Sequence, residues 1–376
     1  MPGKTLKIIL IALAIGGLGL LLAGRLLPQK TAGAVDGPAA SGQTADSVPL
    51  SPGSGAAVSP LSATNTLPLS TSLVFGGDVM LSRVVGQKMA KYKDFAWPFQ
   101  KLKDLLSQAD LAVINLESPF TLDSKSYVVP TGSFSFNADP RALAGLEAAG
   151  VDLVALANNH FANQGQKGMR DTFKLLEQKN IAYAGAGADL TAAHAGTILD
   201  KNGIRFGFLD YGYPVDSSNA GTDRPGIANM DLASARTDVQ RMKGQADLVI
   251  VLIHDGVEYT NLPTSHQKEF ARAMIDAGAD LIVGHHPHWV QQVEIYENKP
   301  IIYSLGNLVF DQMWSQETRE GALVKVELSG RNIRQLEFIP IIINDYGQPW
   351  LVTDLAQKKR ILQRMGLENE VIDLEN

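Results

Sequence analysis

Four segments of the chain repeat one hydrophobic pattern, in which an amphipathic stretch precedes a short apolar run that ends in polar residues. The apolar runs are ADLAVINLE (109–117), VDLVALANNH (151–160), ADLVIVLIH (246–254) and ADLIVGHH (279–286). They are apolar at successive positions, which is typical of strands buried on both faces. The stretches before them have the spacing of amphipathic helices and cover 98–108, 140–149, 231–245 and 265–277. This alternation of helices and strands predicts an α/β fold.

The N-terminal thirty residues have a different pattern, which is typical of a membrane segment. Lys4 and Lys7 precede seventeen uncharged and mostly apolar residues, from Ile8 to Gly24. This is close to the shortest helix that spans the hydrocarbon core of a membrane. We predict an uncleaved transmembrane anchor at 1–30, with the N-terminus in the cytoplasm and the rest of the chain outside it. A cleaved signal peptide is the alternative, because small residues follow at 31–34.

A change in composition marks the next boundary. Residues 31–72 are dominated by Ala, Gly, Ser, Thr and Pro and carry few charged or aromatic side chains. Such a segment buries too little apolar surface to offset the entropy of ordering, so we predict a flexible linker. We expect the folded domain at 73–345 and a separate C-terminal tail at 346–376.

Charge and cysteine content limit the partners and the metal ligands that the chain can have. The formal net charge is −6 and the sequence pI is about 5.7, which gives no broad cationic surface for a polyphosphate backbone. We therefore exclude nucleic acid as a partner. The chain has no cysteine, which excludes disulfides, thiolate catalysis and cysteine-bound zinc. Any bound metal must be held by His, Asp, Glu or Asn side chains.

Polar side chains gather where the predicted strands end, which is where open α/β sheets place their sites. A fifth strand, SLVFGGDVM (72–80), ends in the same way. Together the strand ends offer Asp78, Glu117, Asn159, His160, His254, His285, His286 and His288. This set of carboxylate, amide and imidazole groups suits one or two divalent ions of Mn, Zn or Fe.

The segment GHHPH (284–288) contributes three of these side chains. In an extended chain, residues two apart point the same way, so we expect His286 and His288 to face one ion while Pro287 stiffens the loop. A single strand-end Asp or Asn is usually a cap or turn residue, and a single histidine is usually structural. The metal interpretation therefore rests on the whole set. The remaining histidines, His194 and His266, are predicted to be surface residues.

The sequence also resembles a known family. The motifs FGGDVMLSR, NLESPF, ALANNHFANQG, HDGVEY, GHHPHWVQ and IIYSLGNLVFDQ occur in the order found in the CapA family of poly-γ-glutamate capsule biosynthesis proteins, also called PgsA-like. The resemblance covers roughly residues 73–312. It implies the fold of calcineurin-like metallophosphoesterases, a four-layer α-β-β-α sandwich.

The resemblance also implies roles for individual residues. The metal ligands would be Asp78, Glu117, Asn159, His254, His286 and His288. His160 would be the catalytic residue near the leaving group. The residues that support the ligands without binding metal would be His285, Asn158 and Asn307.

Three positions depart from the pattern of metallophosphoesterases. Met80 stands where the Asp-x-His motif of these enzymes has a histidine, and a thioether is a poor ligand for such ions. Asp255 replaces the Trp of a His-Trp-Gly motif, which changes the charge beside the site. Asn163 stands where many relatives have Asp.

Two main functions remain open at this level. The first is a membrane-anchored, extracytoplasmic accessory to the synthesis, export or release of poly-γ-glutamate or a related envelope polymer. Its partners would be the membrane, an anionic polymer and a capsule-synthase membrane complex. The second is a general extracellular metal-dependent phosphoesterase acting on a phosphoester substrate. A non-catalytic, metal-containing binding domain is a weaker alternative, so whether the chain is a hydrolase stays open.

Overall fold

The computed structural model describes residues 70–122, 124, 127–213 and 217–374. The predicted membrane anchor and nearly all of the predicted linker lie outside these residues. Among the helices that are described, none has both the length and the apolar character needed to cross a membrane.

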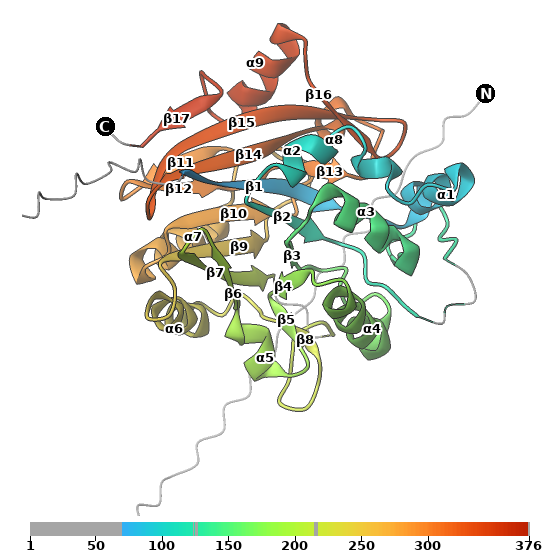
Figure 1. Ribbon diagram of the computed structural model, residues 1–376, viewed down its shortest axis with the longest axis horizontal. Helices are drawn as coiled ribbons and strands as arrows, with labels where there is room; N and C mark the ends of the chain where they lie inside the picture. Colours follow the sequence, from blue (N-terminus) through green and yellow to red (C-terminus); the bar gives the residue numbers. More distant parts are fainter. Residues whose placement is uncertain (1–69, 123, 125–126, 214–216, 375–376) are drawn as a thin grey trace, which may run out of the picture. The chain divides into compact units, whose positions relative to one another are not determined.

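The larger of the two main sheets contains, among the described residues, nine strands in the order β16-β15-β14-β1-β2-β3-β4, with β13 beside β1 and β17 beside β15 (Figure 1). β1 to β4 run parallel, whereas β14 to β17 are antiparallel to their neighbours. The strands are β1 Ser70–Val79, β2 Leu111–Leu116, β3 Leu153–Ala155, β4 Ala182–Ala184, β13 Asn307–Val309, β14 Glu320–Ser329, β15 Asn332–Asn344, β16 Gln348–Leu351 and β17 Val371–Asp373.

The smaller main sheet has the order β11-β12-β10-β9-β7-β6. Its inner strands are parallel, and β6 and β11 add antiparallel edges. The strands are β6 Thr197–Lys201, β7 Ile204–Gly212, β9 Leu248–His254, β10 Leu281–His285, β11 Val293–Tyr296 and β12 Lys299–Ile302. A short third sheet pairs β5 Ala186–Gly187 with β8 Gly226–Ile227.

Most helices cover the outer faces of the two main sheets, but the helix at Leu355–Arg364 contributes Ile361 and Leu362 to the core between the sheets. The helices are α1 Arg83–Tyr92, α2 Lys103–Ser107, α3 Leu143–Ala149, α4 Gly165–Gln178, α5 Leu190–Ala195, α6 Leu232–Lys243, α7 Ser265–Ala277, α8 Gln316–Arg319 and α9 Leu355–Arg364, with 3-10 turns at Trp97–Phe99 and Pro140–Ala142. Local sequence explains several of their starts, because Asp189, Asp231 and Asp354 each accept a backbone N–H at the N-terminus. At α7, Thr264 and Gln267 form a reciprocal capping box.

In the described part of the chain, three hydrophobic cores separate four layers. The first core joins the outer face of the larger sheet to helices α1 to α4, with Ile114 and Leu176 among its members. The second lies between the two sheets and includes Phe75 and Phe208. The third joins the smaller sheet to α6 and α7, with Val251 among its members. The observed order is therefore helices, sheet, sheet, helices.

The prediction of an α/β fold is confirmed, and each predicted helical stretch contains a helix in the structure. The stretches at 140–149, 231–245 and 265–277 contain α3, α6 and α7, and the stretch at 98–108 contains α2. β2 and β9 are buried at every position, as their continuous apolar runs indicate. Residues after 345, which the sequence sets apart as a tail, form β16, α9 and β17, and both strands pair with β15.

Candidate metal centre

The carboxyl ends of β1, β2, β9 and β10 bring the polar side chains together. Asp78 lies beside Asn115 in the β1–β2 register, and His254 lies beside His285 in the β9–β10 register. Gly77 permits the approach of a neighbouring loop, because a Cβ there would overlap the carbonyl oxygen of Gly306. The Asp78 backbone N–H donates to that same carbonyl at 3.0 Å, which fixes the end of β1.

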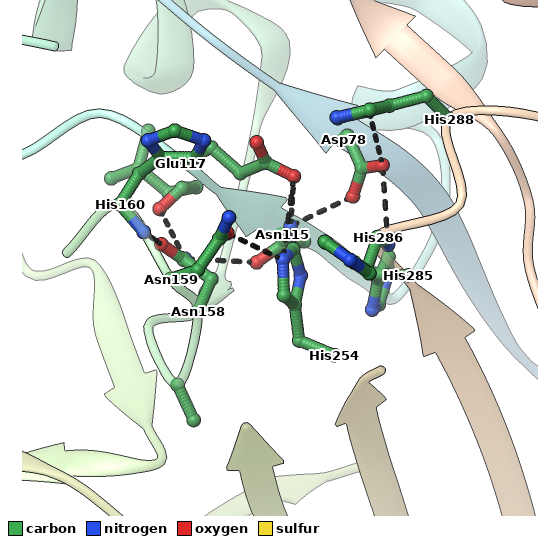
Figure 2. A network of polar contacts seen from close by, with 12 residues as sticks. Asp78, Asn115, Glu117, Asn158, Asn159, His160, His254, His285, His286 and His288 are labelled. Carbon is green, nitrogen blue, oxygen red and sulfur yellow. Dashed lines mark hydrogen bonds and ion pairs between the residues drawn. The ribbon is translucent and has the colours of Figure 1, made fainter. Parts of the chain in front are cut away.

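Three of the predicted ligands converge directly. Asp78, Glu117 and His254 each offer a ligand atom, and these atoms lie within 4.8 Å of one another. All three side chains are buried. Figure 2 shows them pointing toward one another from separate strands. This arrangement is suited to a divalent cation, since a carboxylate pair and an imidazole are ordinary ligands for Mn, Zn and Fe.

Asn115 lies at the centre of this group and was not predicted from the sequence. Its Nδ2 donates to Asp78 Oδ1 at 2.8 Å and to Glu117 Oε1 at 3.2 Å, and it lies 3.2 Å from His254 Nδ1. A signal was available, because Asn115 interrupts an apolar run two positions before Glu117 and therefore shares its face of the strand. It links all three converging side chains.

The two buried carboxyl groups have opposite pKa shifts. Burial opposes the ionisation of Asp78, but the hydrogen bond from His288 and nearby imidazoles outweigh it and hold the pKa of Asp78 well below its usual range. Burial, followed by the negative charge of Asp78, raises the pKa of Glu117 well above its usual range. The repulsion between two carboxylates is what a bound cation would relieve.

Three imidazoles of the site have lowered pKa values, which favour the neutral form. Burial, with the neighbouring histidines, lowers the pKa of His254 and of His286. Burial also lowers the pKa of His285. A neutral ring keeps a lone pair for a metal, so these histidines are in the protonation state that ligation requires.

The GHHPH loop is not extended, contrary to the expectation from sequence. β10 ends at His285, and then His286 has φ of +98° and His288 has φ of +57°. Non-glycine residues adopt such angles at an energetic cost, and they cluster at functional sites. Their rings are 6.2 Å apart between centroids, and the His286 ring lies 4.8 Å from that of His254. Both rings reach the site by a turn and not by strand alternation.

Asn307 gives His288 its orientation. The Asn307 Nδ2 donates to Gln312 Oε1 at 3.1 Å and to the Thr318 carbonyl at 2.9 Å, which identifies Oδ1 as the free acceptor. That oxygen lies 2.9 Å from His288 Nδ1, and Asp78 Oδ2 lies 3.2 Å from the same nitrogen. The proton of His288 is thus on Nδ1, and Nε2 is left for a ligand.

The turn after β3 carries the remaining predicted residues. Asn158 donates to Asn115 Oδ1 at 3.2 Å and to the Leu116 carbonyl at 2.9 Å, and its own Oδ1 accepts the His160 backbone N–H at 3.2 Å. Asn159 Oδ1 lies 3.0 Å from His254 Nε2. Asn158 therefore anchors the turn, and Asn159 joins the ligand group through His254 (Figure 2).

His160 occupies a pocket that disfavours its charged form. Its ring stacks on Phe136 with centroids 4.0 Å apart, and burial lowers its pKa to about 4. Asn163 Oδ1 accepts the Phe136 backbone N–H at 2.7 Å and lies 3.1 Å from His160 Nδ1, so Nδ1 carries the ring proton. Nε2 of the neutral ring is consequently an acceptor. The role of His160 as the catalytic residue near the leaving group, which the resemblance implies, stays a prediction.

Met80 lies away from the ligand group. Its side chain is fully buried in the core between the larger sheet and its helices, and its sulfur accepts the Ser82 backbone N–H at 3.1 Å. Met80 therefore offers no ligand beside Asp78. His285 turns its Nε2 toward the Gly76 carbonyl oxygen at 3.2 Å.

The polar groups present fit a divalent metal. Among the described residues, Glu117 Oε2, His285 Nδ1 and His286 Nδ1 are buried without a hydrogen-bond partner. Buried polar atoms are almost always paired, so three such atoms beside the Asp78 group indicate a ligand that completes the site. The positions of Asn159, His286 and His288 as metal ligands remain predictions.

Comparisons with known proteins agree on one family. The model of the family described as bacterial capsule synthesis protein PGA_cap matches residues 72–312. The capsule biosynthesis protein CapA of Bacillus anthracis is 33% identical over 319 residues, covering 82% of this chain and 75% of that protein. The PGA biosynthesis protein CapA of Bacillus subtilis (strain 168) is 33% identical over 299 residues, covering 78% and 77%.

Solved structures give more distant likenesses. A hypothetical protein from Thermus thermophilus is 16% identical, with a TM-score of 0.47 over 75% of this chain and 99% of that one. A putative 5'-nucleotidase from Staphylococcus aureus is 12% identical, with a TM-score of 0.44 over 79% and 58%. At these scores neither structure adds to the account of the site.

Proposed function

Because the chain belongs to the family of bacterial capsule synthesis proteins called PGA_cap, we propose that it assists the synthesis, export or release of poly-γ-glutamate or a related envelope polymer. The match covers the residues from β1 to the end of the IIYSLGNLVFDQ motif, which include every predicted site residue. The names of the curated relatives, which refer to capsule or PGA biosynthesis, support the same polymer.

The observation that carries a functional role for the site is the convergence of Asp78, Glu117 and His254 with unpartnered buried atoms beside them. We propose that these residues, with Asn159, His286 and His288, hold one or two divalent ions of Mn, Zn or Fe. A divalent cation in this position binds anionic oxygens and activates water. The four layers and the strand-end site support a fold of the metallophosphoesterase type.

The chain's own residues have defined tasks in this proposal. Asn307 and Asp78 fix the tautomer and orientation of His288, and Asn158 anchors the turn that carries Asn159. His160, neutral at pH 7, presents Nε2 as an acceptor for a proton of a substrate or of water.

We place the protein at the cell membrane, with its folded domain outside the cytoplasm. The lysines before the apolar residues 8–24 support that orientation. This location suits an accessory of polymer export, and a capsule-synthase membrane complex is the proposed partner. Its test is protease accessibility of the folded domain on intact cells that express the full-length chain. Protection from protease until the cells are lysed contradicts the placement.

The function is tested with the full-length chain loaded with Mn. We expect it to bind poly-γ-glutamate and to lose that binding when the metal is removed by a chelator. The matched control is Asp78→Asn, which removes one ligand charge at nearly constant volume. If the metal-free chain and the variant both bind the polymer as tightly as the Mn-loaded wild-type chain, polymer handling does not depend on the metal centre.

A second candidate function is a metal-dependent phosphoesterase, favoured by the position of His160 and the ligand group around it. Turnover of a generic phosphodiester with Mn, abolished by Asp78→Asn, would establish that activity. Polymer binding without such turnover supports the accessory function. Phosphodiester turnover without polymer binding supports the second candidate.

A further inference from the structure

A cavity opens beside the proposed metal centre. Its volume is about 490 Å³, and its lining includes the three proposed ligands Asn159, His254 and His286. Asp255 and His266 also line the cavity, and neither has a role in the proposed metal centre. A substrate group held at the metal centre can therefore extend over these two side chains.

Asp255 and His266 form a fixed pair in the lining of the cavity. The Asp255 side chain is 6% exposed, and its Oδ2 lies 2.7 Å from His266 Nδ1. Asp255 directly follows the last residue of β9, and the capping box at Thr264 and Gln267 holds His266 in the first turn of α7. Both partners are thus carried by rigid elements.

The pair presents acceptor atoms to the cavity. In the tautomer that directs Nδ1–H at Asp255, Nε2 of His266 is an acceptor, and no described residue is bonded to it. The His266 side chain is 52% exposed, so a substrate can reach this nitrogen. Asp255 Oδ1 likewise has no partner among the described residues.

The charges around the cavity also favour an N–H donor at the Asp255–His266 pair. No lysine or arginine is among the described residues that line the cavity. The proposed metal would supply positive charge beside the cavity, and Asp255 supplies negative charge within its lining. An anionic group therefore belongs at the metal centre, and an N–H donor belongs at the Asp255–His266 pair.

We propose that Asp255 and His266 form a subsite for amide N–H groups of a substrate whose carboxylates bind at the adjacent metal centre. Poly-γ-glutamate offers both groups in every residue. This inference rests on the proposed function, and it makes the pair a determinant of specificity for an amide-linked polyanion over a polyanion without N–H groups.

The experiment compares two polymers of matched length on the Mn-loaded full-length chain. Poly-γ-glutamate carries carboxylates and amide N–H groups, whereas polyacrylate carries carboxylates only. We expect the wild-type chain to bind poly-γ-glutamate about tenfold more tightly, as one hydrogen bond to a charged or paired acceptor provides. Dissociation constants are measured by isothermal titration calorimetry.

The variants Asp255→Asn and His266→Ala should lose this preference and leave polyacrylate affinity within about twofold, because the metal centre is unchanged. The control is His194→Ala, which breaks a similar His–Asp pair with Asp238 elsewhere in the chain. It should keep the preference.

The outcomes separate the two proposals. A wild-type chain that binds neither polymer contradicts the proposed function and the subsite together. A wild-type chain that binds poly-γ-glutamate, with the same preference in both variants, overturns the subsite alone. An equal loss of affinity for both polymers in the variants also overturns the subsite, since that result indicates damage to the metal centre.

Discussion

Among the described residues, one cluster around Asp238 and another at the strand ends both contain histidine and carboxylate. They differ in how many of their polar atoms have hydrogen-bond partners. The Asp238 cluster lies where α5, α6 and β7 meet. Asp238 Oδ2 lies 2.7 Å from His194 Nδ1 and accepts the Tyr211 hydroxyl at 3.1 Å. Its Oδ1 accepts from Arg241 at 3.3 Å. Each oxygen of the carboxylate has a donor, and His194, predicted on the surface, is partly buried by this contact.

In the strand-end cluster, formed by Asp78, Asn115, Glu117 and His254, the hydrogen-bonding capacity is not fully met. Asn115 is shared among Asp78, Glu117 and His254, and Glu117 Oε2 has no partner among the described residues. The pKa of Glu117 is raised, first by burial and then by Asp78. The comparison teaches that unmet hydrogen-bonding capacity, and not the presence of histidine and carboxylate, distinguishes a ligand site from a structural cluster.

The largest expected effect is the loss of metal when a converging ligand is removed. Asp78→Ala or His254→Ala should weaken Mn or Zn binding by more than about 100-fold, beyond the usual cost of losing an outer partner. Elemental analysis of the purified variants checks this. Asp238→Asn is the control and should keep the wild-type metal content. Metal retained in both ligand variants would contradict the assignment.

Another buried carboxylate, Asp210, lies outside both clusters and is tested through the pH dependence of stability. Its Oδ2 accepts the backbone N–H groups of Leu156 and Ala157 at 2.9 and 2.8 Å, and burial raises its pKa to about 7. The folded state holds the proton of Asp210 more tightly than the unfolded state does. Protonated Asp210 therefore contributes to the stability of the fold below about pH 4, and this contribution is lost as the pH rises to about 7.

Asp210→Asn should remove this pH dependence. Between pH 4.5 and 8, the free energy of unfolding of the variant relative to wild type should shift by on the order of 3 kcal/mol in favour of the variant. Chemical denaturation of the metal-free chains at both pH values measures the shift. A constant difference between the two proteins would show that Asp210 is ionised throughout.

Removing the satisfied carboxylate should affect stability and not metal binding. Asp238→Ala leaves His194, Tyr211 and Arg241 without their shared acceptor, and we expect the free energy of unfolding to fall by about 2 kcal/mol. Urea denaturation gives the change, and elemental analysis of the same sample should show unaltered metal. Loss of metal in Asp238→Ala would remove the distinction between the clusters.

The smallest expected effect concerns the orientation of one proposed ligand. Asn307→Ala removes the acceptor of His288 Nδ1, and we expect metal affinity to fall by about tenfold. Competition with a chromophoric chelator measures the affinity. Asn307→Asp keeps an acceptor at that place and should recover most of it. An unchanged affinity in Asn307→Ala would show that Asp78 alone orients His288.

The sequence predicts the fold well where local pattern and burial agree. β2 and β9 are recognisable because they are apolar at successive positions and end in polar residues. The start of α7 is recognisable from the capping-box residues Thr264 and Gln267. The strands after residue 345 are harder, because β16 and β17 are short, partly exposed edges that depend on pairing with β15.

The site is predictable in its residue types and not in its geometry. Asp78, Glu117 and His254 follow from their places at strand ends. Asn115 was missed because it lies inside an apolar run, and its importance appears only when three strands meet around it. The positive φ angles of His286 and the tautomer of His288 depend on tertiary contacts that no local pattern encodes.

The most direct test of the central claim is the metal stoichiometry of the full-length chain after exposure to Mn, Zn or Fe, compared with that of Glu117→Gln. The glutamine keeps the side-chain size and removes the unpartnered carboxylate oxygen. We predict at least one equivalent of metal in the wild-type chain and a clear loss in the variant. A wild-type chain that takes up none of the three metals would contradict the account.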